Sequence, residues 1–343
     1  MTRIIVRLSA LAVLSLSLAA GALAEPLRVV TSVPDLADLV RVVGGEEVEV
    51  ESLVRGPQDA HFMDPRPTFV RRLHDADLYV EMGMQLEIGW SPVLLQSARN
   101  PKIRPGGEGY VDASLAIAPL EVPTGTVTRA AGDVHAYGNP HYLSDPLNGL
   151  RVARLLRDRL SAARPAAAAG FASRTAAFEQ ALLGRLVGPE LAARFPADEI
   201  VAAVEQDRLE SWLQGKGGAA ALGGWLARLS NARGVAVVQD HRLWPYFTHR
   251  FGLRPVAELE PLPGIAPTTS HLTEVVALVK SQQVRLLIAS PYFDPRHART
   301  VADLTGIPVV TLAHQVGALP GADDYLSTVD LNVRRVGEVL GGG

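Results

Sequence analysis

Leu27-Arg28-Val29-Val30-Thr31-Ser32-Val33, followed at once by Pro34-Asp35, is the stretch that decides the fold. The run is rich in β-branched residues and predicts a strand, and Pro34-Asp35 begins a helical pattern that ends at Gly44-Gly45. A second strand-like run extends from Val48 to Val54. This strand, helix, strand order predicts a parallel sheet, and the loops at the carboxyl ends of such strands commonly form the functional site.

The same alternation returns from Val235 to the end of the chain. With 343 residues the chain is long enough for two hydrophobic cores, so we expect two α/β lobes. An alanine-rich helical pattern that begins at Pro165 predicts a long helix connecting them. The expected organisation is an N-terminal lobe over 25–164, the connecting helix over 165–188 and a C-terminal lobe over 189–343, in which 189–234 has the character of a helical insertion.

The first 24 residues have the three parts of a secretory signal peptide. Arg3 and Arg7 supply the charged part, Leu8 to Leu18 the apolar part, and Ala22-Leu23-Ala24 the cleavage site. The apolar run is too short for a membrane span. Because the chain has no cysteine, it can carry neither a disulfide nor a lipidated cysteine. We therefore expect an exported, freely diffusing periplasmic protein that is not a lipoprotein.

The composition argues against nucleic acid as a partner, because the formal charge is -3 and no block of basic residues occurs. Hydrophobic residues at 48% and charged residues at 20% are ordinary for a globular protein. We expect a monomer.

Three histidines stand in loops that follow predicted strands or rigid proline turns. His61 follows Gly56-Pro57-Gln58-Asp59-Ala60, His141 lies between Pro140 and Pro146, and His241 follows the strand at Val235–Gln239. The prolines predict a rigid, extended turn around His141. A single loop histidine is most often solvated or hydrogen-bonded, but three at the site-forming end of α/β lobes predict a shared metal ion. Imidazole nitrogen suits Zn²⁺, and a fourth side chain or water completes a tetrahedron.

An aspartate stands near each of these histidines: Asp59, Asp145 and Asp240. Each could orient an imidazole N–H from behind, as carboxylates do at many metal sites. The alternative role is a helix cap or a turn, which for Asp145 before Pro146 is at least as strong.

The sequence resembles the solute-binding proteins of zinc and manganese ABC importers, the helical-backbone metal receptor superfamily. The segment around His61 resembles the first ligand motif of that family, Asn139-Pro140-His141-Tyr142 with Asp145-Pro146 the second, and Asp240-His241 with Trp244-Pro245-Tyr246-Phe247 the third. The resemblance implies two lobes joined by a long, rigid helix, with a metal ion in the cleft between them and His61, His141 and His241 as its ligands. A histidine at the third position favours Zn²⁺ over Mn²⁺ or Fe²⁺.

The expected fourth ligand departs from that family. Many members have an aspartate just after the last strand, where this chain has Thr311-Leu312-Ala313-His314-Gln315. We expect His314 as the fourth ligand, with water or a carboxylate from elsewhere as alternatives. Asp294 is the next candidate, although capping a helix suits it better. His135, in the short loop before His141, could recruit zinc transiently, but a surface position without that role is favoured.

The predicted function is capture of Zn²⁺ in the periplasm and its delivery to the membrane permease of a metal ABC importer, with a periplasmic metallochaperone as a further partner to consider. We do not expect an enzyme, because the sequence has neither a His-Glu-x-x-His helix nor a Gly-x-Ser-x-Gly turn. A zinc hydrolase is one alternative, since three histidines and an open position also describe a catalytic site. A receptor for Mn²⁺, Fe²⁺ or a metal chelate is the other.

Overall fold

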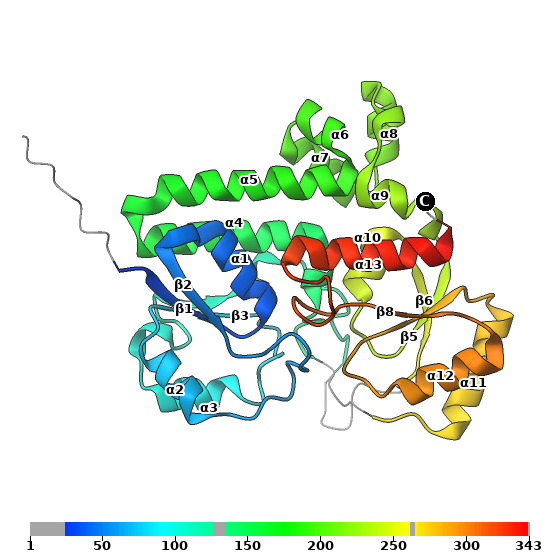
Figure 1. Ribbon diagram of the computed structural model, residues 1–343, viewed down its shortest axis with the longest axis horizontal. Coiled ribbons are helices and arrows are strands. Elements are labelled where there is room, and N and C mark those ends of the chain that lie inside the picture. The colour runs from blue at the N-terminus through cyan, green and yellow to red at the C-terminus, as the bar shows by residue number, and fades with distance from the viewer. Residues whose placement is uncertain (1–24, 126–134, 261–264, 342–343) are drawn as a thin grey trace, which may run out of the picture.

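The computed structural model describes residues 25–125, 135–260 and 265–341, which form two four-stranded sheets side by side (Figure 1). The strand orders are β2-β1-β3-β4 and β6-β5-β7-β8, and every neighbouring pair is parallel. The predicted pair of α/β lobes is therefore confirmed. The two lobes share one topology, in which the first strand of each sheet is central.

The N-terminal lobe is built around β1, whose Val29 and Val30 are buried because helices cover the sheet. Pro34 begins α1 in the position where its missing N–H costs nothing. The elements of this lobe are β1 (Leu27–Thr31), α1 (Pro34–Gly44), β2 (Val48–Ser52), α2 (Pro67–His74), β3 (Leu78–Glu81), α3 (Ser91–Ala98) and β4 (Tyr110–Asp112).

The C-terminal lobe repeats this plan around β5, all four residues of which are buried. Its last helix, α13, begins with a capping box in which the side chains of Asp324 and Ser327 each accept from the other's backbone N–H. The elements are α9 (Gly224–Arg228), β5 (Ala236–Gln239), α10 (Pro245–Phe251), β6 (Arg254–Glu258), α11 (Thr269–Ser281), β7 (Leu286–Ala289), α12 (Pro295–Thr305), β8 (Val309–Thr311) and α13 (Tyr325–Leu340).

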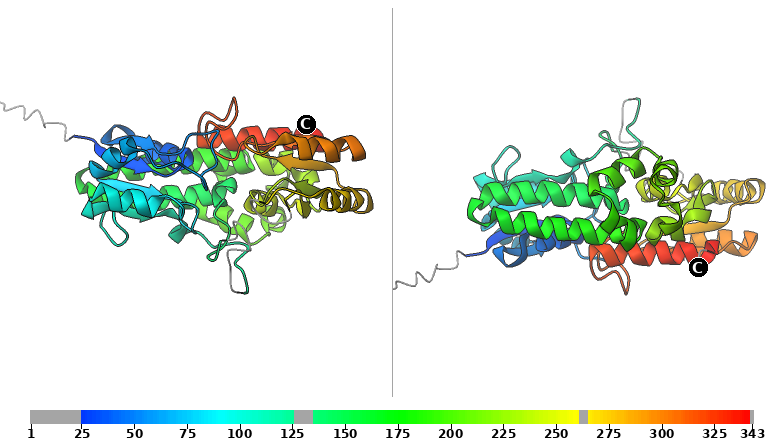
Figure 2. Two further views of the ribbon diagram at one scale, coloured as in Figure 1. Left: turned by 90° about the horizontal axis from the view of Figure 1, so that it is seen from below. Right: turned by 90° about the horizontal axis from the view of Figure 1, so that it is seen from above.

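Two long helices, α4 (Pro146–Ala163) and α5 (Ala168–Val187), pack against each other and against α1. A short 3-10 turn, Pro165–Ala167, joins them, and Figures 1 and 2 show them running back to back along the N-terminal lobe. The chain enters the C-terminal half at Gly188, whose φ of 97° ends α5.

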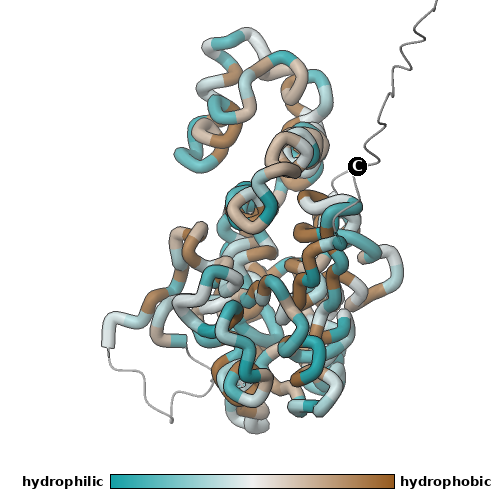
Figure 3. The backbone as a smooth tube through the Cα atoms, turned by 90° about the vertical axis from the view of Figure 1, so that its left-hand side faces the viewer, coloured by the Kyte–Doolittle hydropathy of each residue, from teal (hydrophilic) through white to brown (hydrophobic). Residues whose placement is uncertain are grey.

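Three short helices stand above α5, on the side away from the sheets (Figures 1 and 3). They are α6 (Pro189–Arg194), α7 (Ala197–Glu205) and α8 (Leu209–Lys216), and Asp207, with φ of 51°, separates the last two. Arg154 of α4 attaches this segment through Asp198 at 2.9 Å. Of the helices in the described ranges, none is both long and apolar enough to cross a membrane.

One buried apolar cluster connects the two lobes. It extends from β1 through α4 and α5 to α10, β7 and α13, and includes Val29, Leu150, Phe178, Trp244, Ile288 and Val333. The lobes are thus joined by packed side chains as well as by the chain itself, which limits their relative movement.

Candidate metal site

Four imidazole rings, those of His61, His135, His141 and His241, lie together. The centroid of the His61 ring is 5.1 Å from that of His141, 5.3 Å from that of His135 and 6.3 Å from that of His241. The rings of His141 and His241 are 6.4 Å apart. The structure thus brings together the three histidines predicted as ligands, and it adds His135.

The closest approach joins Nε2 of His61 to Nε2 of His135, at 3.2 Å. Two nitrogens bonded to one tetrahedral zinc ion, at about 2.0 Å each, stand about 3.3 Å apart. The two rings therefore face each other at nearly the separation of ligands that share an ion. His135 is half-buried, and its contact with His61 was not predicted from the sequence.

Three of the four rings reach the cluster from positions beside a strand or a 3-10 helix. His61 lies in the loop after β2 and His241 directly follows β5 and its Asp240. His141 does not lie on an extended turn, because its φ and ψ of -84° and 37° begin the 3-10 helix Tyr142–Ser144. The carboxamide of Asn139 holds this turn by accepting from the N–H of His141 at 2.9 Å.

Asp59 orients His61 as predicted. Its Oδ1 accepts from the backbone N–H of His61 at 2.9 Å and lies 2.8 Å from Nδ1 of the ring. Burial raises the pKa of Asp59, but the hydrogen bonds and charge of His61 outweigh burial and hold that pKa below its usual range. An ionised Asp59 keeps the proton of His61 on Nδ1, which leaves the lone pair of Nε2 free for a ligand.

Glu260 orients His241, a role that the sequence analysis missed. Oε2 of Glu260 lies 2.6 Å from Nδ1 of His241, and the two side chains are only 12% and 5% exposed. Gln239 of β5 and Glu258 of β6 face each other in the sheet. His241 lies two residues after Gln239, and Glu260 lies two residues after Glu258. Parallel pairing therefore places the carboxylate beside the ring.

Asp240 does not contact the ring of His241. Its Oδ1 accepts from the backbone N–H of His241 at 2.8 Å, and its Oδ2 accepts from the N–H and the hydroxyl of Ser290 at 2.5 and 3.0 Å. Burial raises the pKa of Asp240 to about 7. This aspartate fastens the loops after β5 and β7, so the prediction that it orients an imidazole was wrong.

Asp145 is a helix cap and half of an ion pair between the lobes. Its Oδ1 accepts from the N–H of Leu147 at 2.9 Å, which caps α4. The guanidinium of Arg250 in α10 donates to both carboxylate oxygens, at 2.9 and 2.8 Å. The alternative interpretation of Asp145 is confirmed, and its proposed role behind His141 is not.

Burial keeps two of these imidazoles neutral. Together with the charges of the neighbouring histidines, which contribute less, burial lowers the pKa of His135 to about 3 and that of His141 well below its usual value. A neutral imidazole retains the lone pair that binds a metal, so no proton has to leave these two rings at neutral pH.

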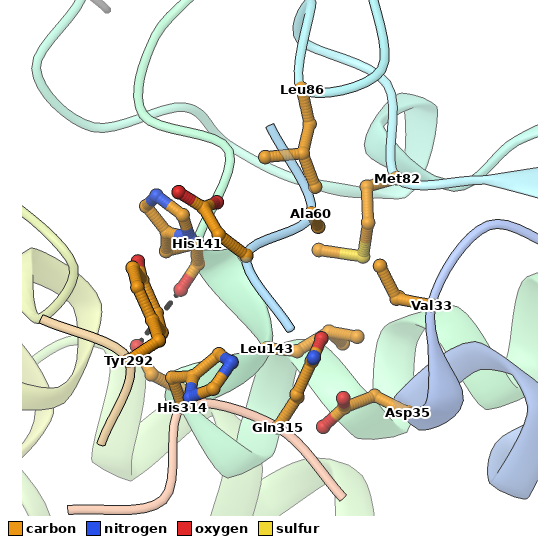
Figure 4. A pocket seen from close by; sticks show the side chains of 12 residues that line it. Val33, Asp35, Ala60, Met82, Leu86, His141, Leu143, Tyr292, His314 and Gln315 are labelled. Atoms are coloured by element: carbon orange, nitrogen blue, oxygen red, sulfur yellow. Dashed lines mark hydrogen bonds between the residues drawn. The ribbon is translucent and has the colours of Figure 1, made fainter. Parts of the chain in front are cut away.

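His314 lies at the edge of the site. It lines a small cavity of about 40 Å³ with Asp35, His141, Tyr292 and Gln315, and Figure 4 shows it opposite His141, beside Tyr292. Its Nε2 is 3.2 Å from the carbonyl oxygen of Gln58, and its ring centroid is 4.6 Å from that of Tyr292. Its buried Nδ1 has no hydrogen-bond partner among the described residues. Its role as fourth ligand stays a prediction.

Asp294 caps α12, since its Oδ1 accepts from the N–H of Arg296 at 3.0 Å. Its other oxygen pairs with the Arg296 guanidinium, so the capping role expected of it is confirmed. Within the described ranges, no group of three or more His, Cys, Asp or Glu side chains is arranged so that it could hold a metal ion as it stands. The rings of the cluster would therefore have to move before they could share one ion.

Two parallel-sheet lobes with a cluster of loop histidines are the features of a two-lobed metal receptor. The sequence profile described as "ZnuA: Zinc-uptake complex component A periplasmic" matches residues 29–184 and 220–339. The chain belongs to this family, whose members are solute-binding proteins of metal ABC transporters and not enzymes. The unmatched gap contains α6, α7 and α8.

Named relatives differ in their metal. The chain is similar to the zinc-binding lipoprotein AdcA of Streptococcus pneumoniae, at 21% identity over 317 residues, 90% of this chain and 54% of that protein. It is also similar to the manganese ABC transporter substrate-binding lipoprotein PsaA of Streptococcus mitis, at 27% identity over 144 residues, 41% of this chain and 43% of that protein. The chain spans about half the length of these curated relatives or less.

Among solved structures, the crystal structure of ZnuA superposes with a TM-score of 0.66 at 18% identity. The match covers 92% of this chain and 99% of that one. At this identity the likeness establishes the shared fold.

Proposed function

We propose that this chain captures Zn²⁺ in the cleft between lobes spanning 25–164 and 189–343, with 165–188 as the linker. His61, His141 and His241 are three ligands and His135 is the fourth. The observation that carries the proposal is the gathering of four imidazole rings whose centroids are separated by 5.1 to 6.4 Å along the measured pairs. His314 is the alternative fourth ligand.

The donor atoms favour zinc over manganese. The cluster offers imidazole nitrogens, which suit Zn²⁺, whereas Mn²⁺ prefers carboxylate, carbonyl and water oxygens. The two nearest carboxylates, Asp59 and Glu260, are occupied behind the rings by Nδ1 of His61 and of His241. Fe²⁺ accepts imidazole as well and is the second choice.

We propose that the protein delivers the metal to the permease of an ABC importer, which its family membership supports, and that a metallochaperone is a further partner. We propose that the protein works in the periplasm as a monomer, exported by the signal peptide at 1–24, which lies outside the described residues. AdcA and PsaA are named lipoproteins. This sequence contains no cysteine to carry a lipid.

A competition titration tests the proposal. Chelator-stripped protein is titrated with Zn²⁺ and with Mn²⁺ against an indicator of known affinity, and we expect one zinc ion per chain and much weaker manganese binding. His135→Ala should weaken zinc binding more than His314→Ala, while His297→Ala in α12 serves as the control. Tighter binding of Mn²⁺, or zinc binding that survives loss of His61 unchanged, would overturn the proposal. A larger loss with His314→Ala than with His135→Ala would reassign the fourth ligand.

A further inference from the structure

The segment that follows β8 reaches across to the N-terminal lobe. There the carboxamide of Gln315 donates to the carbonyl oxygens of Arg55 at 3.1 Å, Gly56 at 3.0 Å and Gln58 at 2.9 Å. Gln315 is only 4% exposed. One side chain of the C-terminal half thus binds three backbone carbonyl groups of the loop that leads to His61.

Backbone contacts support this crossing. Gly56 and Gly317 are so close that a Cβ on Gly56 would lie 2.2 Å from the carbonyl carbon of Gly317. The N–H of Val316 donates to Asp35 at the start of α1 at 3.2 Å. The C-terminal lobe therefore meets the N-terminal lobe here without room for even one methyl group.

The other end of the segment is fixed to the C-terminal lobe. The carboxamide of Asn332 in α13 accepts from the N–H of Ala313 and donates to its carbonyl oxygen, both at 2.8 Å. Gln315 is two residues beyond this anchor. The anchor at Ala313 therefore fixes the backbone that carries Gln315, and the carboxamide of Gln315 in turn fixes the loop before His61.

The loop passes this order on to the imidazole. A turn closes between Arg55 and Gln58, where the N–H of Gln58 donates to the carbonyl of Arg55 and the N–H of Arg55 donates to the Gln58 side chain, both at 2.9 Å. Asp59 comes directly after this turn and binds both the backbone and the ring of His61. The path from Gln315 to Nε2 of His61 consists of hydrogen bonds and one short piece of chain.

We infer that Gln315 is a positioning residue for His61, through which the C-terminal lobe sets the place of a ligand carried by the N-terminal lobe. The inference rests on the proposed function, because it concerns the affinity of the same site. Without the carboxamide, the three carbonyl groups hydrogen-bond to water instead. The loop then gains conformational freedom, which metal binding must remove. Groups that hydrogen-bond a metal ligand directly contribute about 10- to 100-fold to metal affinity, and Gln315 acts one step further from the ligand, so we expect an effect at the lower end of that range.

Asn100 offers a matched control. It is 7% exposed, and its carboxamide also donates to three carbonyl oxygens, those of Leu73, His74 and Ala76, at 3.0, 3.1 and 2.8 Å. These carbonyls end α2 and have no part in the histidine cluster. Loss of Asn100 therefore removes the same kind of hydrogen bonds without touching the path to His61.

The test measures zinc affinity of the full chain by indicator competition for Gln315→Ala, Asn100→Ala, His61→Ala and the double variant of Gln315 and His61. We expect Gln315→Ala to weaken zinc binding about 10-fold or more, and Asn100→Ala to bind as the wild type does. Because Gln315 acts through His61, its loss in the His61→Ala background should change nothing further. Equal weakening in that background, or a normal affinity of Gln315→Ala, would overturn the inference.

Gln315→Met keeps the volume and removes the donor, and it replaces the alanine variant if that one fails to fold. A wild type that binds no zinc would refute the proposed function itself. A wild type that binds zinc, beside a Gln315 variant that binds it equally well, would refute only the role of Gln315.

Discussion

Glu260→Gln is the substitution whose effect the geometry defines best. The 2.6 Å contact between Glu260 and Nδ1 of His241 joins side chains that are 12% and 5% exposed, so water screens it little. A hydrogen bond to a charged group contributes about 1.5–3 kcal/mol. Glutamine keeps an acceptor oxygen but loses the charge, so we expect the lower end of that range, which weakens zinc binding about 10-fold. Glu260→Ala leaves the buried N–H of His241 unpaired and should weaken it up to about 100-fold.

The assay is indicator competition on chelator-stripped protein, with unfolding by urea as a check that the variants are folded. Glu258→Gln is the matched control, since Glu258 ends β6 two residues before Glu260 and contacts Gln239 and Arg242 instead of a histidine of the cluster. If Glu260→Gln and Glu258→Gln bind zinc equally well, the carboxylate does not prepare His241 and the reasoning fails.

Three further predictions concern the frame of the site. Asp145→Asn leaves Arg250 buried without its countercharge and should cost about 3–5 kcal/mol of unfolding free energy. Asp207→Asn, at an ion pair whose side chains are 71% and 72% exposed, should cost less than about 1 kcal/mol by the same urea assay. Gly56→Ala should weaken both stability and zinc binding because its Cβ would meet Gly317, whereas Gly215→Ala, with nothing within 4 Å, should weaken neither. In the unfolded chain His135 takes up a proton as the pH falls through 6.5, whereas in the folded protein its pKa is about 3 and the ring stays neutral. The unfolded state therefore binds more protons, and the metal-free protein should lose stability as the pH falls from 7 to 4. His135→Gln should show a smaller loss over that range, and an equal loss would contradict the burial of this ring.

The fold was predictable from the sequence because each strand and helix carries its own local signal. Pro34-Asp35 begins a helix and Gly44-Gly45 ends it, whatever the rest of the chain does. The presence of His61 and His241 at the candidate site was predictable for a related reason, since loops after parallel strands meet at one edge of a sheet.

Glu260, Gln315 and the place of His135 were not predictable in this way. Glu260 lies beside His241 only because β6 pairs with β5 in one register, and the sequence alone does not state the strand order. Gln315 acts through carbonyl groups, which every residue has and which leave no mark on the sequence. His135 contacts His61, which lies 74 residues earlier in the chain, and such a tertiary contact has no local signal in the sequence.

Asp240 shows the opposite error, whereas Asp145 has the capping role that the sequence analysis held to be at least as strong. Each stands within four residues of a predicted ligand, and nearness in sequence suggested a role behind the ring. In the structure Asp145 binds Arg250 and Asp240 binds Ser290, because a short carboxylate pairs with whichever donor the fold presents.

X-ray absorption at the zinc edge tests the central claim most directly. Protein loaded with one equivalent of Zn²⁺ should show four nitrogen or oxygen ligands at about 2.0 Å, with the multiple scattering of at least three imidazoles. His135→Ala should reduce the imidazole count by one. A six-coordinate shell of oxygen atoms, or a spectrum with fewer than three imidazoles in the wild type, would contradict the account.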